Sequence, residues 1–139
     1  MSAGWEALIW NGDLAPAGKE NQYSPEMSGY QDYLAADKYS DGLQVWLDLR
    51  ELLKDYKPDV VGITVRTPAY NSFKNCVRII REELPSARVI AGGPHISALP
   101  DEPSIDRAFV GEGEIQLMAY LGVPFTCFDG WPARGKVYN

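Results

Sequence analysis

The chain has 139 residues, of which 45% are hydrophobic and 23% are charged, and its formal net charge at pH 7 is -6. This length and composition are those of one ordinary globular domain with a core of its own. The negative charge argues against nucleic acid or an anionic membrane as the main partner, and no apolar run reaches the roughly 20 residues that span a bilayer. The first residues do not follow the basic-then-apolar order of a signal peptide, so we expect a cytoplasmic protein.

The first predicted strand is the apolar run at residues 7–10, which stops at Asn11-Gly12-Asp13. Residues 14–39 follow, a stretch in which prolines and glycines alternate with several tyrosines. This stretch is too aromatic for a disordered linker and too interrupted for a long helix. We therefore expect an ordered, aromatic-rich insert after the first strand.

A helix is predicted from Ser40, a candidate N-cap, to about Tyr56, because its leucines and Trp46 form one apolar face. Pro58 follows the end of this helix, and a strand at residues 60–65 comes next. Since this strand is apolar on both faces, we expect it to be a central strand that is covered on both sides.

A second helix is predicted from Ser72, as its N-cap, to Pro85, because apolar residues repeat there at a spacing of three to four. It is followed by a strand at residues 88–91, an irregular turn at 96–102, a strand at 107–110 and a helix at 114–121. Helices that alternate with apolar strands predict an α/β fold, in which a doubly wound, mostly parallel sheet lies between layers of helices.

Few residues of the chain could carry cysteine or histidine chemistry. Cys76 and Cys127 are far apart and in no paired motif, so we expect neither a disulfide nor a cysteine-built zinc site, and we expect Cys76 to be buried on a helix. His95 is the single histidine, and no local motif places it in a catalytic triad or a multi-histidine metal site. We therefore predict no catalytic residue and no metal site in this chain.

Three predicted strands end in loops that expose backbone or polar groups. Glycine lets a ligand approach the backbone, while hydroxyls and a guanidinium suit a ligand with amides and a phosphate. Tight turns alone would explain either glycine pair, but both pairs follow successive strands, whose carboxyl ends form one edge of a parallel sheet. We therefore expect a ligand crevice at that edge. The loop residues concerned are Thr64, Arg66, Thr67, Gly92, Gly93, Gly111 and Gly113.

Two other classes of ligand-binding domain fit the sequence less well. No G-x-G-x-x-G follows the first strand and no G-x-x-x-x-G-K-[ST] occurs, which weakens NAD, FAD and ATP as ligands. A receiver-like signalling domain of flavodoxin topology would need an acidic cluster at its strand ends. Asp13 and Asp59 do not form one, because Asp59 begins its strand.

Five segments, in this order along the chain, carry a resemblance to a known family. They are residues 58–64, 67–72, 92–95, 99–102 and 110–114. Together they closely resemble the cobalamin-binding N-terminal domain of B12-dependent radical SAM enzymes, and the resemblance extends over residues 7–121. It implies a Rossmann-like, flavodoxin-like three-layer α/β/α fold at residues 1–122. Residues 123–139 resemble the connector toward a C-terminal radical SAM domain that is missing here.

The resemblance implies cobalamin as the cofactor and assigns the loop residues by position. The first two loops would line the pocket for the nucleotide tail, and the third would lie against that tail or the corrin edge. Residues after the first strand would cover the lower face of the corrin. The implied cofactor-binding residues are Asn11, Asp13, Leu14, Thr64, Arg66, Thr67, Gly92, Gly93, Pro94, His95, Gly111, Glu112 and Gly113.

The wider B12-binding fold often carries D-x-H-x-x-G after its first strand, with the histidine bound to cobalt from below. Here the corresponding residues 13–18 read Asp-Leu-Ala-Pro-Ala-Gly, so Ala15 stands at the place of the histidine. The radical SAM branch of the family likewise generally lacks this ligand. The resemblance therefore implies cobalamin held base-off, without a histidine lower ligand.

The C-x-x-x-C-x-x-C motif of the radical SAM cluster is absent from this chain. A [4Fe-4S] cluster and S-adenosylmethionine would therefore belong to a C-terminal radical SAM barrel of the same polypeptide, and this chain alone is expected to be non-catalytic. The parent enzyme would be a methyltransferase, or would catalyse a cyclisation or another rearrangement. The alternative is a stand-alone B12-binding sensory or carrier domain without catalysis.

Overall fold

The computed structural model of the chain describes residues 5–10, 42 and 44–123. Several expectations lie outside these residues, and the structure does not bear on them. They concern the insert at 14–39, the connector at 124–139, the predicted cap Ser40, and the residues Asn11, Asp13, Leu14, Ala15 and Cys127.

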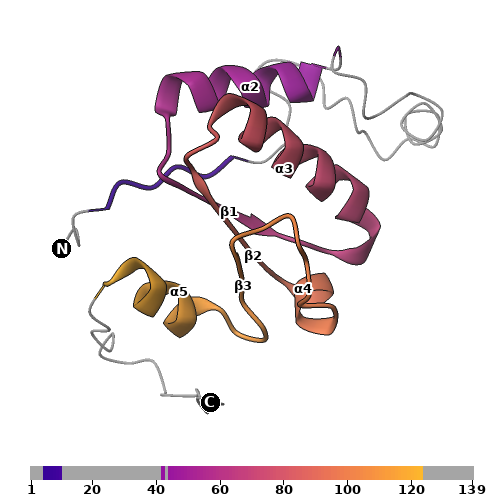
Figure 1. Cartoon of the computed structure of the whole chain (residues 1–139), viewed down its shortest axis with the longest axis vertical. Helices are drawn as coiled ribbons and strands as arrows, with labels where there is room; N and C mark the ends of the chain where they lie inside the picture. Colours follow the sequence, from indigo (N-terminus) through magenta and orange to yellow (C-terminus); the bar gives the residue numbers. More distant parts are fainter. Residues whose placement is uncertain (1–4, 11–41, 43, 124–139) are drawn as a thin grey trace.

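A three-stranded parallel sheet forms the centre of the described structure, with the strand order β1-β2-β3 (Figure 1). The strands are β1 (Val60–Thr64), β2 (Arg88–Gly92) and β3 (Arg107–Ala108). Parallel neighbours need crossover connections, which α3 (Tyr70–Glu83) supplies between β1 and β2. The short α4 (Pro94–Ala98) and a loop connect β2 to β3. The structure thus confirms an α/β fold with a parallel sheet.

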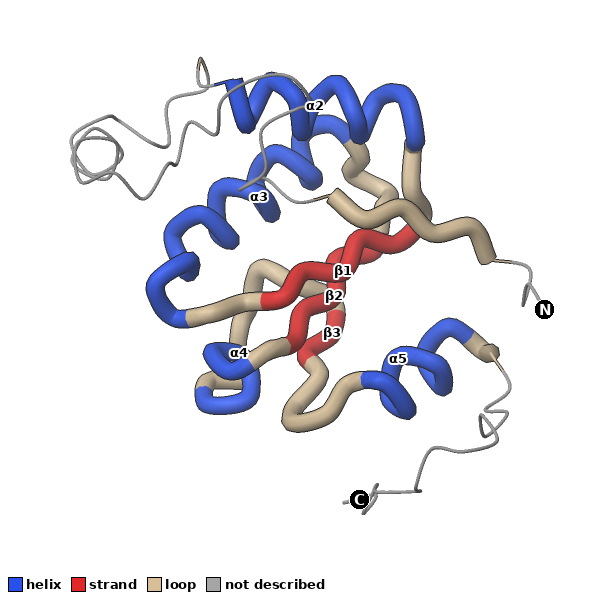
Figure 2. The backbone as a smooth tube through the Cα atoms, turned by 180° about the vertical axis from the view of Figure 1, so that it is seen from behind, coloured by secondary structure: helices blue, strands red, loops and turns tan. Residues whose placement is uncertain are grey.

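Helices lie on two sides of this sheet. The first helix, α2 (Gln44–Tyr56), lies beside α3 on one side, and α5 (Glu114–Leu121) lies on the other (Figures 1 and 2). The predicted ends of α2 at Tyr56 and of α5 at residues 114–121 are confirmed. No helix within the described ranges is long and apolar enough to cross a membrane.

The hydrophobic core lies between the sheet and the layer formed by α2 and α3. Phe73, Val77 and Ile80 recur at helical spacing on α3 and are each at most 3% exposed. Val89 in β2 is fully buried beneath them. Full burial of one such side chain contributes roughly 1.5–3 kcal/mol, so this layer dominates the stability of the fold. From α2, the core receives Trp46, Leu49 and Leu53.

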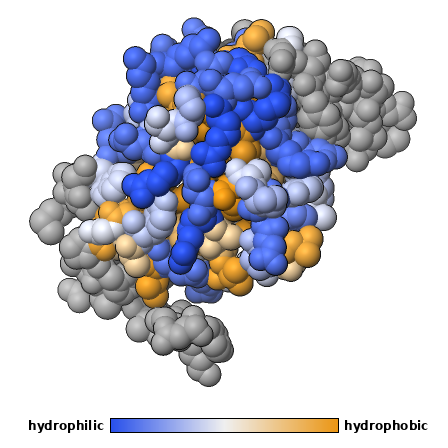
Figure 3. All heavy atoms as spheres, in the orientation of Figure 1, coloured by the Kyte–Doolittle hydropathy of each residue, from blue (hydrophilic) through white to orange (hydrophobic). Residues whose placement is uncertain are grey.

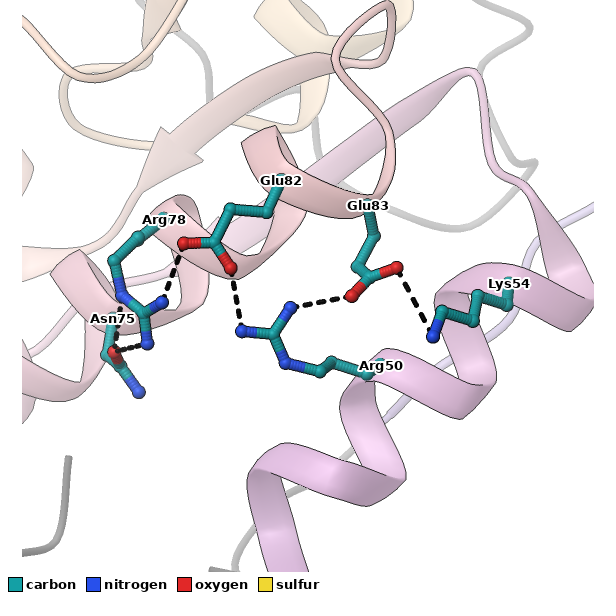
Figure 4. Close-up of polar contacts among 6 residues, drawn as sticks. All are labelled: Arg50, Lys54, Asn75, Arg78, Glu82 and Glu83. Carbon is teal, nitrogen blue, oxygen red and sulfur yellow. Dashed lines mark hydrogen bonds and ion pairs between the residues drawn. The ribbon is translucent and has the colours of Figure 1, made fainter. Parts of the chain in front are cut away.

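A network of charged side chains joins the outer faces of α2 and α3 (Figure 4). Arg50 on α2 donates to Glu83 at 2.6 Å and to Glu82 at 2.7 Å, and Arg78 donates to Glu82 at 2.7 Å. Hydrogen bonds from Arg50 and Arg78 lower the pKa of Glu82. Figure 3 shows mostly hydrophilic atoms over these two helices, so their outer faces form a solvated side of the molecule.

The expectation that residues 60–65 form a central strand is wrong for the described sheet. β1 is an edge strand with Gly62 and Thr64 exposed, and β2 occupies the centre. The predicted first strand at residues 7–10 is also wrong, since residues 5–10 form no strand and Ile9 is 93% exposed. The two errors are related. Residues 7–10 were expected to form a strand, and β1 would be central only if such a strand paired with its free edge.

Three further local predictions are corrected. Ser72 does not cap α3, because Thr67–Ala69 forms a 3-10 turn, η1, and the helix begins directly after it at Tyr70. The turn expected at 96–102 is wrong for its first part, because residues 94–98 form α4. Proline favours the first position of a helix, and Pro94 occupies it here. The last strand is shorter than predicted, since β3 ends at Ala108.

Candidate functional site

The loops that follow β1 and β2 are joined by backbone hydrogen bonds. The N–H of Val65 donates to the carbonyl of Gly92 at 2.8 Å, and the N–H of His95 donates back to the carbonyl of Val65 at 3.1 Å. Phe109 begins the loop after β3, and its N–H donates to the carbonyl of Ala91 in β2 at 2.8 Å. The three loops thus lie at the carboxyl edge of the sheet, and the ligand crevice expected there stays a prediction.

Gly93 is required by the contact between the first two loops. Its φ is +99°, and a Cβ built on it would lie 2.8 Å from the carbonyl oxygen and 2.9 Å from the nitrogen of Val65. No L side chain is accommodated there, because both clashing atoms are backbone. A Cβ on Gly92 would stay 3.6 Å from its nearest neighbour, an ordinary contact distance. The sequence pattern had indicated ligand access for this pair, and the structure gives Gly93 an internal packing role.

The loop after β3 is held by hydrogen bonds with Ser97 and Gln116, and there is open space at the Cβ position of Gly111. Gly111 has a φ of +75°, and no atom lies within 4 Å of a Cβ built on it. Its N–H donates to Ser97 Oγ at 2.9 Å. Gln116 Nε2 donates to the carbonyls of Val110 at 2.8 Å and Glu112 at 3.0 Å. A ligand can therefore approach the backbone at Gly111 along an edge whose shape is already held.

The loop after β1 presents polar side chains to solvent. Thr64, Arg66 and Thr67 are all exposed. Arg66 lies directly before the η1 turn. Its guanidinium has no hydrogen-bond or ion-pair partner among the described residues. A guanidinium of this kind suits a phosphate group, because its planar fork can form two parallel hydrogen bonds to one.

The side chain of His95 is directed into the structure. It is 8% exposed, its Nδ1 lies 3.2 Å from Thr67 Oγ1, and its ring stacks on Tyr70 with 4.4 Å between ring centroids. The imidazole of His95, in the loop after β2, thus contacts Thr67 and Tyr70, which follow β1. Pro94 beside it and Glu112 in the third loop are both exposed at the same edge.

Two hydrogen-bonded residues next to these loops, Tyr70 and Glu102, were not identified as site residues from the sequence. The hydroxyl of Tyr70 donates to Glu102 Oε2 at 2.7 Å, and this bond raises the pKa of Tyr70. Burial raises the pKa of Glu102, but hydrogen bonds from Ser104 and Tyr70 outweigh it, so the pKa is lowered overall. Both residues lie in the segments that carry the resemblance, yet no spacing rule pairs residues 32 positions apart.

Other side chains of the described structure offer little reactive chemistry. No group of three or more His, Cys, Asp or Glu residues within the described ranges is placed to hold a metal ion. Cys76 lies on α3, as predicted, but it is half-buried rather than buried, and this burial raises the pKa of its thiol to about 11. Because the thiolate is the nucleophile, this cysteine is unreactive at neutral pH.

Comparison with protein families gives a match over most of the described chain. A family model described as the B12 binding domain matches residues 32–121, a range that holds all three loops of the carboxyl edge. No solved structure gives a significant match to the chain.

Curated relatives carry names from two kinds of enzyme. The chain is 34% identical over 98 residues to an anaerobic magnesium-protoporphyrin IX monomethyl ester cyclase of Rubrivivax gelatinosus, an alignment covering 67% of this chain and 17% of that protein. It is 33% identical over 86 residues to an uncharacterized methyltransferase of Pyrococcus horikoshii, covering 56% of this chain and 19% of that one. A cytidylyl-2-hydroxyethylphosphonate methyltransferase of Streptomyces wedmorensis is 28% identical over 79 residues, covering 53% and 15%. The matched region therefore spans less than a fifth of these relatives.

Proposed function

This chain belongs to the B12 binding domain family, and we propose that it is the cobalamin-holding module of a B12-dependent radical SAM enzyme. The observation that carries the proposal is the coincidence of the family match with the three joined loops at the carboxyl edge. Ligands of open α/β sheets bind in the crevice at this edge.

The residues at the edge suit the chemistry of cobalamin. Its phosphate would pair with Arg66, and its amide side chains would meet the hydroxyls of Thr64 and Thr67. The open backbone at Gly111 would accept the tail or the edge of the corrin ring, with Gly113 and Glu112 beside it. Gly92 and Gly93 would form the floor of the tail pocket, and Pro94 and His95 its wall. The fold that presents these loops would be the Rossmann-like, three-layer arrangement of the family.

The cobalt would have no histidine below it. His95 is the single histidine of the chain, and its ring is already engaged with Thr67 and Tyr70. Asn11, Asp13 and Leu14 would instead cover the lower face. When bound, cobalamin would supply a methyl group or a one-electron cobalt centre. The chain's own residues would bind and orient it.

The reaction would belong to the parent protein. The relatives named as methyltransferases and cyclases support a parent that transfers a methyl group or closes a ring. Because the chain spans less than a fifth of their length, the [4Fe-4S] cluster and S-adenosylmethionine would belong to a C-terminal barrel, reached through residues 123–139.

Gel filtration after mixing the chain with hydroxocobalamin tests the binding proposal. The cobalamin absorbance is expected to elute with the protein, in proportion to it. A colourless protein peak at every cofactor concentration would refute the proposal.

A further inference from the structure

Tyr70, which follows the loop after β1, contacts two residues of the connection between β2 and β3. It begins α3 directly after the β1 loop, its ring stacks on His95 at 4.4 Å, and its hydroxyl donates to Glu102 at 2.7 Å. His95 belongs to the chain that follows β2, and Glu102 to the chain that leads into β3. The side chain of Tyr70 thus joins the start of α3 to two points of the connection between β2 and β3.

Glu102 is itself held in place. Its Oε1 accepts the hydroxyl of Ser104 at 2.6 Å and the backbone N–H of the same residue at 3.1 Å. Oε2 accepts the Tyr70 hydroxyl. The carboxylate therefore offers Tyr70 an acceptor that is fixed by two other hydrogen bonds. Since the hydroxyl has one proton to donate, that proton is committed to Glu102.

We propose that Tyr70, acting through Glu102 and His95, is a positioning residue of the cobalamin site. It holds the loops after β1 and β2 in the binding arrangement before the cofactor arrives. The proposal rests on the proposed function, since it concerns the same edge. A site whose binding arrangement is only partly populated binds more weakly in proportion to that population. A ring stack and a hydrogen bond to a carboxylate each favour one arrangement of the loops.

Tyr70→Phe tests this directly, because it keeps the ring on His95 and removes only the hydroxyl. Hydroxocobalamin is titrated into the full chain, and circular dichroism confirms that both proteins are folded. The Kd of the variant is expected to rise about five- to tenfold over wild type. Tyr120→Phe is the matched control, since the Tyr120 hydroxyl makes no hydrogen bond to the described residues and its loss should leave Kd unchanged.

A double-mutant cycle with Glu102→Ala shows whether Tyr70 acts through Glu102. The double variant is expected to bind no more weakly than the weaker single variant, because both changes remove one interaction. Additive losses would overturn the proposal, as would wild-type affinity in Tyr70→Phe. If Glu102→Ala does not fold, the Tyr70→Phe titration decides alone.

The cycle also separates this inference from the function on which it rests. Absence of binding by the wild-type chain would refute both. Binding by wild type with equal affinity in Tyr70→Phe would refute the positioning role and leave the cobalamin proposal standing.

Discussion

Gly93 lies against the backbone of Val65 so closely that a Cβ on the glycine would be 2.8 Å from the carbonyl oxygen of Val65. The same carbonyl accepts a hydrogen bond from the N–H of His95 at 3.1 Å. The loops after β1 and β2 therefore form one packed unit at the edge where the ligand is proposed to bind.

Gly93→Ala is expected to destabilise the chain by roughly 2–3 kcal/mol, because the substitution adds both a left-handed backbone strain and a backbone clash. Urea unfolding monitored by circular dichroism measures the loss. Gly92→Ala is the control and should cost less than about 1 kcal/mol, since its Cβ would meet only ordinary contacts. Equal losses in the two variants would contradict this account of the loop.

Lys57, the residue that follows α2, has a strained, left-handed backbone conformation. It has a φ of 49°, and its N–H donates to the carbonyl of Leu53 at 3.0 Å, as in a helix C-terminal cap. Lys57→Gly is expected to raise the free energy of unfolding by about 0.5–1 kcal/mol, because glycine adopts this conformation without a Cβ penalty. Lys57→Ala removes the same side chain and keeps the Cβ, so it should give no gain. An equal gain in the free energy of unfolding for Lys57→Gly and Lys57→Ala would show that loss of the lysine side chain, and not relief of backbone strain, stabilises the chain.

Acid is expected to destabilise the fold through Asp106. The backbone N–H of Val89 and the guanidinium of Arg81 lower the pKa of its carboxyl in the folded state. A lowered pKa contributes stability above the unfolded value of about 3.9, and this contribution is lost as the pH falls through the folded value. The free energy of unfolding should therefore decrease from about pH 5 downward.

Urea titrations at a series of pH values check this dependence. Asp106→Asn is expected to be less stable than wild type at pH 7 and to lose less stability on acidification. Asp101→Asn, at an exposed carboxylate without a hydrogen bond to the described residues, serves as the control. If the free energy of unfolding of Asp106→Asn fell with pH as steeply as that of wild type, other carboxyl groups would be responsible for the acid destabilisation.

Arg66 is expected to hold the phosphate of the nucleotide tail. Arg66→Gln should raise the Kd for hydroxocobalamin about three- to tenfold, because a charge-assisted hydrogen bond is lost. Cobinamide, which lacks the nucleotide and its phosphate, should bind both proteins equally. Arg107→Gln alters an exposed arginine on β3 and is the control. An equal loss for cobinamide would move the contact of Arg66 from the phosphate to the corrin.

Local patterns along the sequence predicted those features that depend on local physics. The apolar spacing on α3 and the runs in β1 and β2 depend on the side chains of neighbouring positions. The place of β1 in the sheet depends on a partner strand, and two strands with similar apolar runs cannot be ranked by their own residues. The sequence pointed to an irregular turn where α4 forms, because the helical preference of Pro94 at a first helical position was not recognised.

The candidate site follows the same division. Glycines and polar residues after successive strands predicted a ligand crevice, and the parallel sheet places the three loops at one carboxyl edge, where the crevice stays a prediction. The bond between Tyr70 and Glu102 joins residues 32 positions apart, and no periodicity records such a contact. The role of Gly93 also became visible only through its distance to Val65.

Base-off cobalamin binding can be measured by electron paramagnetic resonance of the reduced, cob(II)alamin-loaded chain after gel filtration. A cobalt signal is expected to elute with the protein and to show no nitrogen superhyperfine splitting, because neither His95 nor the nucleotide base would ligate the metal. A protein fraction without cobalt would contradict cobalamin binding, and a signal split by one nitrogen would contradict the base-off, histidine-free arrangement.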